Sequence, residues 1–224
     1  MVKISETKGR SDANSGYARL FGNQQLGQLI SRVHATVIRT GNELERIIEA
    51  ATPEHLKTNL HTILEQRGLF ASDIQVVFQG RMPGTVKQSG STIDVAVFDH
   101  PNCNVSIIEL KDGDTFDTKK SSGELDSMMK FADWISNKTA YSATFYFCSF
   151  NQDDKEAIVR GAKGRFDVSH AMTGRELCTI LGIDYDVLRE KRQSKQSENL
   201  GYFLSELLKI SEIRQFIRKL LNEA

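Results

Sequence analysis

Residues 92–111 read TIDVAVFDHPNCNVSIIELK and contain two runs rich in β-branched and aromatic residues on either side of a short polar break. Val, Ile, Thr and Phe favour strands, so residues 92–98 and 105–110 are predicted to be strands. Residues 99–102 (DHPN) between them are typical of a turn. The stretch therefore predicts a β-hairpin.

Three charged residues lie at one end of this hairpin. Asp94 is near the start of the first strand, and Glu109 and Lys111 end the second. Side chains alternate along a strand, so Glu109 and Lys111 project to one face and Leu110 to the other. The hairpin brings Asp94 beside Glu109. Two carboxylates and one ammonium group are thus predicted to converge at one edge of a sheet.

Such a trio suits phosphodiester hydrolysis. Mg²⁺ binds one or two carboxylates, retains several waters and also binds a phosphate. Lys111 would orient or deprotonate the attacking water, and the backbone carbonyl of Leu110 could be a further ligand. Taken alone, Glu-x-Lys is more often an ion pair on a surface hairpin. The aliphatic run before Glu109 and the matching position of Asp94 favour the metal site.

The period of apolar residues places the remaining elements around this hairpin. Helices are predicted over 26–51, divided at Gly41, and over 53–67, 123–136, 177–181 and most of 185–224. Residues 74–78 and 141–150 are predicted strands, the second an interior one reached by a parallel crossover. The fold class is α/β: a central mixed β-sheet flanked by helices, with helical N- and C-terminal parts.

The amino-acid composition excludes few classes of function. The chain has 224 residues and a formal net charge of zero, which does not exclude a nucleic-acid partner, because acidic metal ligands offset basic phosphate-binding residues. The three cysteines have neither zinc-site nor disulfide spacing, and Cys148 is expected in the core. We find no export signal and no membrane span, and expect a cytoplasmic protein.

Asp94 with Glu109-Leu110-Lys111 resembles the PD-(D/E)XK nuclease motif, with Ile93 in the place of the family's proline. The similarity is best over residues 79–150, and the layout resembles a type II restriction endonuclease. It implies a homodimer that acts on double-stranded DNA with Mg²⁺ and no organic cofactor, in a prokaryotic cell. Residues 1–14 are expected to be flexible. Residues 15–224 would form one nuclease domain, helical over 15–70, with the catalytic sheet and crossover helix over 71–150 and a mainly helical part over 151–224.

The N-terminal helices carry a second resemblance. Ser31-Arg32 and the stretch 41–45 (GNELE) resemble the first helices of many restriction enzymes, where a glutamate assists metal binding. Glu45 is the position that the resemblance implies, with Glu49 as a substitute one turn later. The alternative, that both are solvated charges on a helix face, stays open.

Two loops flank the hairpin and start near the predicted metal site. Their basic and polar residues could contact phosphates or base edges, and solvated loop charges are the alternative. The candidates for DNA binding are Arg81, Lys87, Gln88, Ser89, Lys119 and Lys120.

Three functions follow, in order of preference. The first is a type II restriction enzyme that hydrolyses both strands at a short specific site and leaves 5′-phosphates. The second is a repair nuclease or junction resolvase of the same fold. The third is a catalytically inactive DNA-binding protein. The apolar face of the last helix is assigned to the core, with dimerisation there left open.

Overall fold

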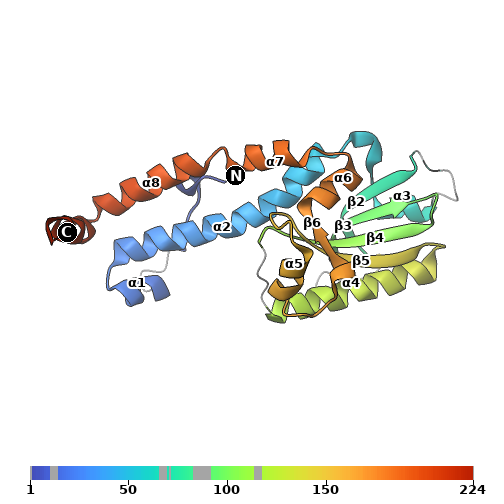
Figure 1. Cartoon of the computed structure of the whole chain (residues 1–224), viewed down its shortest axis with the longest axis horizontal. Coiled ribbons are helices and arrows are strands. Elements are labelled where there is room, and N and C mark those ends of the chain that lie inside the picture. Colours follow the sequence, from blue (N-terminus) through green and yellow to red (C-terminus); the bar gives the residue numbers. More distant parts are fainter. Residues whose placement is uncertain are drawn as a thin grey trace. The chain divides into compact units, whose positions relative to one another are not determined.

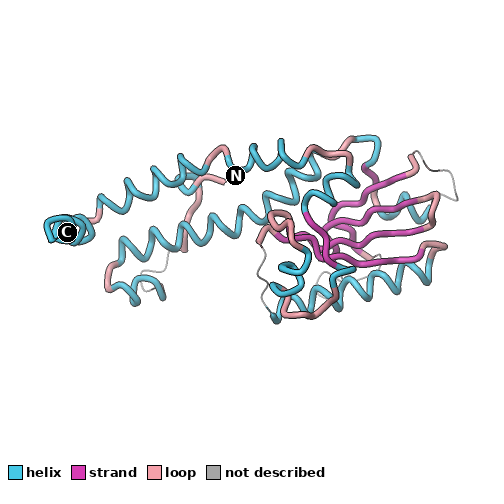
Figure 2. The backbone as a smooth tube through the Cα atoms, viewed as in Figure 1, coloured by secondary structure: helices cyan, strands magenta, loops and turns pink. Residues whose placement is uncertain are grey.

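The computed structural model describes residues 2–10, 15–65, 70, 72–82, 92–113 and 118–223, with the backbone alone for residues 118–122 (Figures 1 and 2). The chain divides into two compact units. We call Met1–Leu44 with Asp186–Ala224 the helical unit, and Glu45–Tyr185 the sheet unit. A single nuclease domain over residues 15–224 stays a prediction.

The described elements follow in chain order. They are η1 (Ile4–Glu6), α1 (Gly16–Phe21), α2 (Gln24–Ala51), η2 (Glu54–Leu56), β1 (Lys57–Thr58), α3 (Leu60–Glu65), β2 (Ile74–Arg81), β3 (Thr92–Asp99), β4 (Asn104–Lys111), α4 (Thr118–Lys138), β5 (Ser142–Ser149), α5 (Lys155–Gly161), η3 (Val168–His170), β6 (Ala171–Thr173), α6 (Gly174–Leu181), α7 (Tyr185–Gln193), α8 (Gln196–Lys209) and α9 (Ser211–Glu223).

The strands of the sheet unit form one mixed sheet in the order β1-β2-β3-β4-β5-β6 (Figure 2). β3 is antiparallel to both of its neighbours, β2 and β4. β1 is parallel to β2, and β4, β5 and β6 are mutually parallel. The predicted hairpin is β3–β4, and the predicted parallel crossover is β4–α4–β5. The expected α/β class with a mixed sheet and flanking helices is confirmed.

One face of the sheet packs against α4, which runs alongside it (Figure 1). Met128, Phe131 and Ile135 recur at helical spacing and are almost fully buried. They belong to a core cluster with Ala96 of β3 and Ile107 of β4. These two residues are opposite each other in the ladder, so their side chains lie on the same face of the sheet. This packing holds α4 against the strands that carry the predicted site.

The opposite side of the sheet unit contains α6, whose start is defined by side-chain capping. Thr173 and Glu176 form a capping box, and Gly182 ends the helix in the left-handed conformation. Gly174 lies so close to Phe150 that an added Cβ atom would be 2.2 Å from the Phe150 carbonyl oxygen. Glycine is therefore required for α6 to begin beside β5. Cys148 is fully buried, as expected.

Several predicted elements were wrong in their type or extent. α2 is one helix, and Gly41 lies within it without a break. Residues 53–67 do not form one helix, because Lys57 and Thr58 pair with β2 as β1, and pairing across the sheet overrides the local helical period. β6 was missed. β5 is buried mainly in its C-terminal half, because β6 covers only its last three residues.

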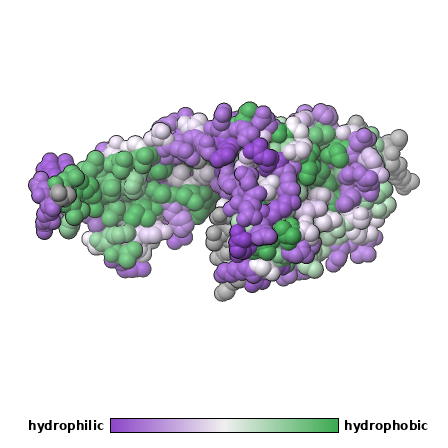
Figure 3. Space-filling model, viewed as in Figure 1, coloured by the Kyte–Doolittle hydropathy of each residue, from purple (hydrophilic) through white to green (hydrophobic). Residues whose placement is uncertain are grey.

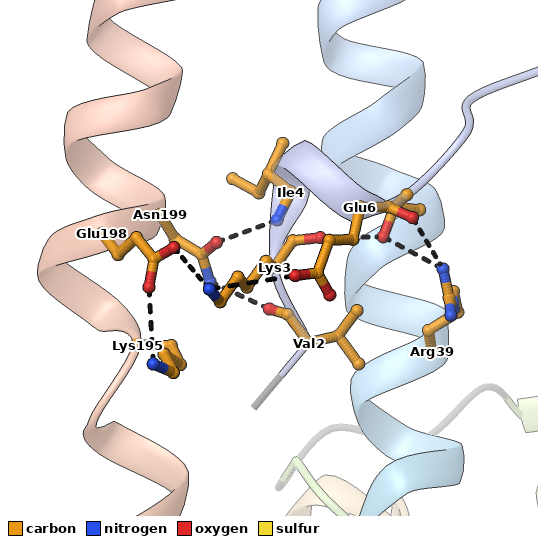
Figure 4. Close-up of polar contacts among 9 residues, drawn as sticks. Val2, Lys3, Ile4, Glu6, Arg39, Lys195, Glu198 and Asn199 are labelled. Atoms are coloured by element: carbon orange, nitrogen blue, oxygen red, sulfur yellow. Dashed lines mark hydrogen bonds and ion pairs between the residues drawn. The ribbon is translucent and has the colours of Figure 1, made fainter.

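In the helical unit, the N-terminal segment contacts α8 (Figure 4). The Ile4 amide donates to Asn199 Oδ1 at 2.9 Å, and Asn199 Nδ2 donates to the Val2 carbonyl oxygen at 3.0 Å. Lys3 forms an ion pair with Glu198 at 2.8 Å. Val2, Lys3 and Ile4 therefore have partners in α8, and the flexibility of residues 1–14 stays a prediction.

The apolar face assigned to the core is buried only in part. Ile210 is buried, Leu207, Ile213 and Ile217 are half-buried, and Leu208, Leu220 and Leu221 are exposed. Phe216, Leu220 and Leu221 of α9 each expose about two thirds or more of their surface, 67%, 64% and 72%. Leu200, Leu204 and Leu208 form an exposed stripe along α8. Figure 3 shows a continuous apolar area over α8 and the adjoining part of α2. Among the described helices, none is long and apolar enough to cross a membrane.

Candidate active site

The register of the hairpin sets Asp94 against Glu109. The ladder between β3 and β4 pairs Asp99 with Asn104 and ends with Val95 opposite Ile108. The next position in the same register holds Asp94 and Glu109. There Asp94 Oδ2 accepts a hydrogen bond from the Leu110 amide at 2.7 Å. The carboxylate thus takes the place of a ladder carbonyl, and this contact fixes its orientation at the end of the paired region.

Lys111 lies on the same strand face as Glu109, two residues further along β4. Its Nζ donates to Glu109 Oε1 at 2.6 Å and to Glu124 Oε1 of α4 at 2.7 Å. The side chains of Glu109, Lys111 and Glu124 are only 10%, 26% and 24% exposed. The three residues predicted from the sequence are therefore together, and a third carboxyl group completes the cluster.

The charges of the cluster do not balance. The cluster contains the carboxyl groups of Asp94, Glu109 and Glu124 and one ammonium group, which gives a net charge of minus two when all are ionised. Burial and the neighbouring Asp94 raise the pKa of Glu109 to about 8. Burial, opposed by the Leu110 amide, raises the pKa of Asp94 to about 6.

The surrounding carboxyl groups also change the pKa of Lys111. Burial acts to lower the pKa of its ammonium group, but Glu109 and Glu124 outweigh burial and raise it. In an isolated ion pair the carboxyl pKa would fall as the amine pKa rose. Here both pKa values rise, because burial and the neighbouring Asp94 outweigh the effect of Lys111 on the Glu109 carboxyl. The cluster therefore lacks positive charge, and a bound cation would supply it.

Glu45 lies near this cluster, at the sheet-unit end of α2. Its Oε2 accepts a hydrogen bond from Gln79 Nε2 at 3.3 Å. Its charge contributes to the raised pKa of Asp94. Glu49, one turn later, is exposed. The structure thus brings Glu45, rather than Glu49, towards Asp94. Gln79 itself has a positive φ of 49° and lies between Phe78 and Gly80, where the β2–β3 ladder skips one pair without a change of register. It was not singled out from the sequence.

The DNA-facing candidates are only partly within the described residues. Arg81 is exposed at the end of β2 and pairs with Thr92, two residues before Asp94. It therefore lies at the same end of the sheet as the cluster. Lys119 and Lys120 are in the first turn of α4, and their side chains lie outside the described part, as do residues 87–89.

Glu124 is the residue that sequence reasoning missed. A signal was present, because Glu124 precedes Met128 by four residues and Phe131 by seven, the spacing of one helix face. In the described part of the chain, no group of three His, Cys, Asp or Glu side chains is arranged to bind a metal ion by itself. Mg²⁺ needs only one or two carboxylates beside waters and other oxygens, so Asp94 and Glu109 fit it chemically.

Comparison with known proteins gives one extended similarity. The chain is 42% identical to a protein described as type II restriction enzyme HhaII from Haemophilus parahaemolyticus, over 228 residues that cover 98% of this chain and 99% of that protein. No family model matches the chain, and no solved structure matches it. The similarity covers both compact units.

Proposed function

The chain belongs to the type II restriction enzymes and is a site-specific deoxyribonuclease, and from this premise we propose that Asp94, Glu109 and Lys111 form its Mg²⁺-dependent catalytic centre. Asp94 with Glu109-Leu110-Lys111 would be a PD-(D/E)XK motif. The single observation that carries the proposal is the cluster at the end of the β3–β4 hairpin, where the half-buried Asp94, the buried Glu109 and the Lys111 ammonium group meet.

The donor set suits a hard divalent cation. Asp94 uses one oxygen for the Leu110 amide and keeps the other, and Glu109 adds a second carboxylate. The N–H and C=O of one strand residue point to the same side, so the Leu110 carbonyl is directed towards β3 beyond the last ladder pair. Glu45 would contribute from α2. Bound Mg²⁺ would stabilise negative charge on the phosphate and make a nearby water more acidic.

Lys111 would act on the attacking water and the phosphate. An ammonium group has three N–H donors, and the contacts to Glu109 and Glu124 use two. The third can orient the water or bind a phosphate oxygen. The water oxygen forms a bond to phosphorus as the bond from phosphorus to the 3′ oxygen breaks. The products are a 5′-phosphate and a 3′-hydroxyl on each cut strand.

Duplex DNA would lie over the end of the sheet that carries the cluster. Arg81 is exposed there and would contact the phosphate backbone, as would Lys87, Lys119 and Lys120. Gln88 and Ser89 would read base edges at the short recognition site. We place the enzyme in the prokaryotic cytoplasm, where it would meet incoming DNA.

Cleavage of both strands favours a homodimer, because each chain carries one such cluster. We propose that the dimer forms through the exposed apolar residues of α8 and α9, since large exposed apolar areas mark protein interfaces. A two-fold axis through this surface would bring the same leucines of both chains together.

The test is digestion of a sequenced phage DNA by the purified protein in Mg²⁺ or in EDTA. We expect discrete fragments in Mg²⁺ that share one short end sequence, and no cleavage in EDTA. Asp94→Asn keeps an acceptor for the Leu110 amide and should lower the cleavage rate by a factor of about 1,000. Asp133→Asn is the control, because it removes an exposed carboxylate from α4. Wild-type cleavage by the Asp94 variant would refute the proposed centre.

Two other outcomes identify the alternatives. Cleavage restricted to branched substrates would indicate a junction resolvase or repair nuclease. DNA binding without cleavage under any divalent cation would indicate an inactive DNA-binding protein.

A further inference from the structure

Glu124 occupies an unexpected place on α4. It lies on the stripe of Met128, Phe131 and Ile135, which are 1%, 0% and 0% exposed. The stripe faces the sheet, so the Glu124 side chain is directed towards β4 and is only 24% exposed. An apolar residue would continue the stripe with better packing. The charge at this position therefore needs an explanation beyond the packing of α4.

The two oxygens of Glu124 have different surroundings. Oε1 accepts from Lys111 Nζ at 2.7 Å. Oε2 is buried and, in the described part of the chain, has no hydrogen-bond partner. A buried carboxylate oxygen without a partner is unfavourable, so this residue is retained at a cost to the fold. Lys111 is the partner that the geometry provides.

We propose that Glu124 is a positioning residue that holds Lys111 in its reactive orientation, an inference that rests on the proposed function of Asp94, Glu109 and Lys111. Lys111 Nζ lies between Glu109 at 2.6 Å and Glu124 at 2.7 Å. A cation bound by Glu109 would compete with Lys111 for that carboxylate. Glu124 belongs to another element and keeps its contact, so the long, flexible lysine side chain stays in place.

Two other roles would produce the same contact. The ion pair could serve only to dock α4 on the sheet, in which case its loss would lower stability. Glu124 could also be a direct ligand of the cation, in which case its loss would raise the Mg²⁺ concentration needed for activity. If Glu124 only positions Lys111, its loss should leave both the stability and the required Mg²⁺ concentration unchanged and should lower the rate of the chemical step.

The variants are Glu124→Leu, which keeps the packing and removes the acceptor, and Glu124→Gln, which keeps an acceptor oxygen without the charge. The assay is single-turnover cleavage of a DNA fragment that the wild type cuts. We expect Glu124→Leu to lower the maximal rate constant about 100-fold and Glu124→Gln about 10-fold. The Mg²⁺ concentration and the enzyme concentration that give half the maximal rate should change less than about twofold.

The matched control is Asp126→Asn. Asp126 is exposed on the same helix, two residues away, so its loss removes one negative charge at a similar position along α4. It should cleave at the wild-type rate. Glu124→Leu should unfold at the same urea concentration as the wild type or a higher one, which separates a loss of rate from a loss of structure.

A double variant tests whether Glu124 acts through Lys111. In the Lys111→Gln background, Glu124→Leu should lower the remaining rate less than about twofold, because the residue it positions is already gone. A wild-type rate for Glu124→Leu, a tenfold rise in the half-saturating Mg²⁺ concentration, or a full additional loss in the double variant would each overturn the assignment. Failure of the proposed function looks different, since Lys111→Gln itself would then cleave like the wild type.

Discussion

Glu109→Gln should make the metal-free protein more stable at neutral pH. Burial and the charge of Asp94 raise the pKa of Glu109 in the folded state to about 8, compared with 4.5 for an ordinary glutamate. Between these values the folded state binds a proton that the unfolded state releases. The stability of the wild type therefore falls as the pH rises from about 4.5 to about 8. Glutamine has no proton to lose and avoids this fall.

The size of the effect follows from the two pKa values. One pKa unit corresponds to about 1.4 kcal/mol, so at pH 7 the release of this proton by the unfolded chain costs the wild type about 3 kcal/mol of stability. At pH 5 the cost is below about 1 kcal/mol, because the unfolded glutamate is only just past its own midpoint. The variant should therefore gain about 3 kcal/mol at pH 7 and little at pH 5.

Urea unfolding in EDTA at the two pH values measures both quantities. Glu156→Gln is the control, because Glu156 also belongs to the sheet unit but its side chain is 79% exposed. It should leave stability within about 0.5 kcal/mol at both pH values. No gain for Glu109→Gln at pH 7, or an equal gain at pH 5, would refute the electrostatic reasoning.

Mg²⁺ should remove most of the stability difference between the wild type and Glu109→Gln at pH 7. A cation that binds only the folded wild type at 100 times its Kd adds about 2.7 kcal/mol to its stability. Glu109→Gln lacks one of the two proposed carboxylate ligands and should gain much less. Equal stabilisation of both by Mg²⁺ would exclude Glu109 as a ligand.

Three further predictions concern other parts of the chain. Arg81→Ala should weaken DNA binding to all sequences similarly and lower the salt dependence of log K by about one, as measured by fluorescence anisotropy. Gly174→Ala should destabilise the fold by more than about 2 kcal/mol in urea unfolding, since its Cβ would be 2.2 Å from the Phe150 carbonyl oxygen. Gly201→Ala in α8, where the added methyl meets nothing within 4 Å, is its control. Leu204→Glu should convert the proposed dimer to a monomer in sedimentation analysis, without loss of helix content.

The trio of Asp94, Glu109 and Lys111 could be brought together from the sequence because its geometry is local. One short turn joins β3 to β4, and the alternation of each strand then determines which side chains share a face. The same register places Asp94 and Glu109 directly beyond the last pair of the ladder. Local order was therefore enough to predict that these three residues meet.

Glu124 could not be found in the same way. The sequence predicts a helix that begins at residue 123, which would place Glu124 in the first turn, where acidic side chains are common for reasons unrelated to function. In the structure α4 begins at Thr118, so Glu124 lies in the helix interior on its buried face. The starting point of a helix and its rotation against a sheet depend on tertiary packing.

Contacts between segments far apart in the chain could not be predicted from the sequence either. β1 and β6 have two and three residues and exist through their pairing with β2 and β5. Ile4 and Asn199 are 195 residues apart, and no periodic pattern relates them. Elements this short have no signal of their own, because their free energy comes from partners elsewhere in the chain.

Helix α4 contributes to stability at some positions and to the proposed chemistry at another. Phe131 and Ile135 are fully buried and stabilise the sheet unit, whereas Glu124 adds a third carboxylate to a cluster that already lacks positive charge. Neutral replacements of Glu109 or Glu124 should accordingly slow cleavage while they keep or raise stability. Truncation of Phe131 to alanine should do the reverse, with a loss of about 3–5 kcal/mol and a normal rate in the fraction that remains folded. A cluster that only docked α4 would lose stability and rate together in all three variants.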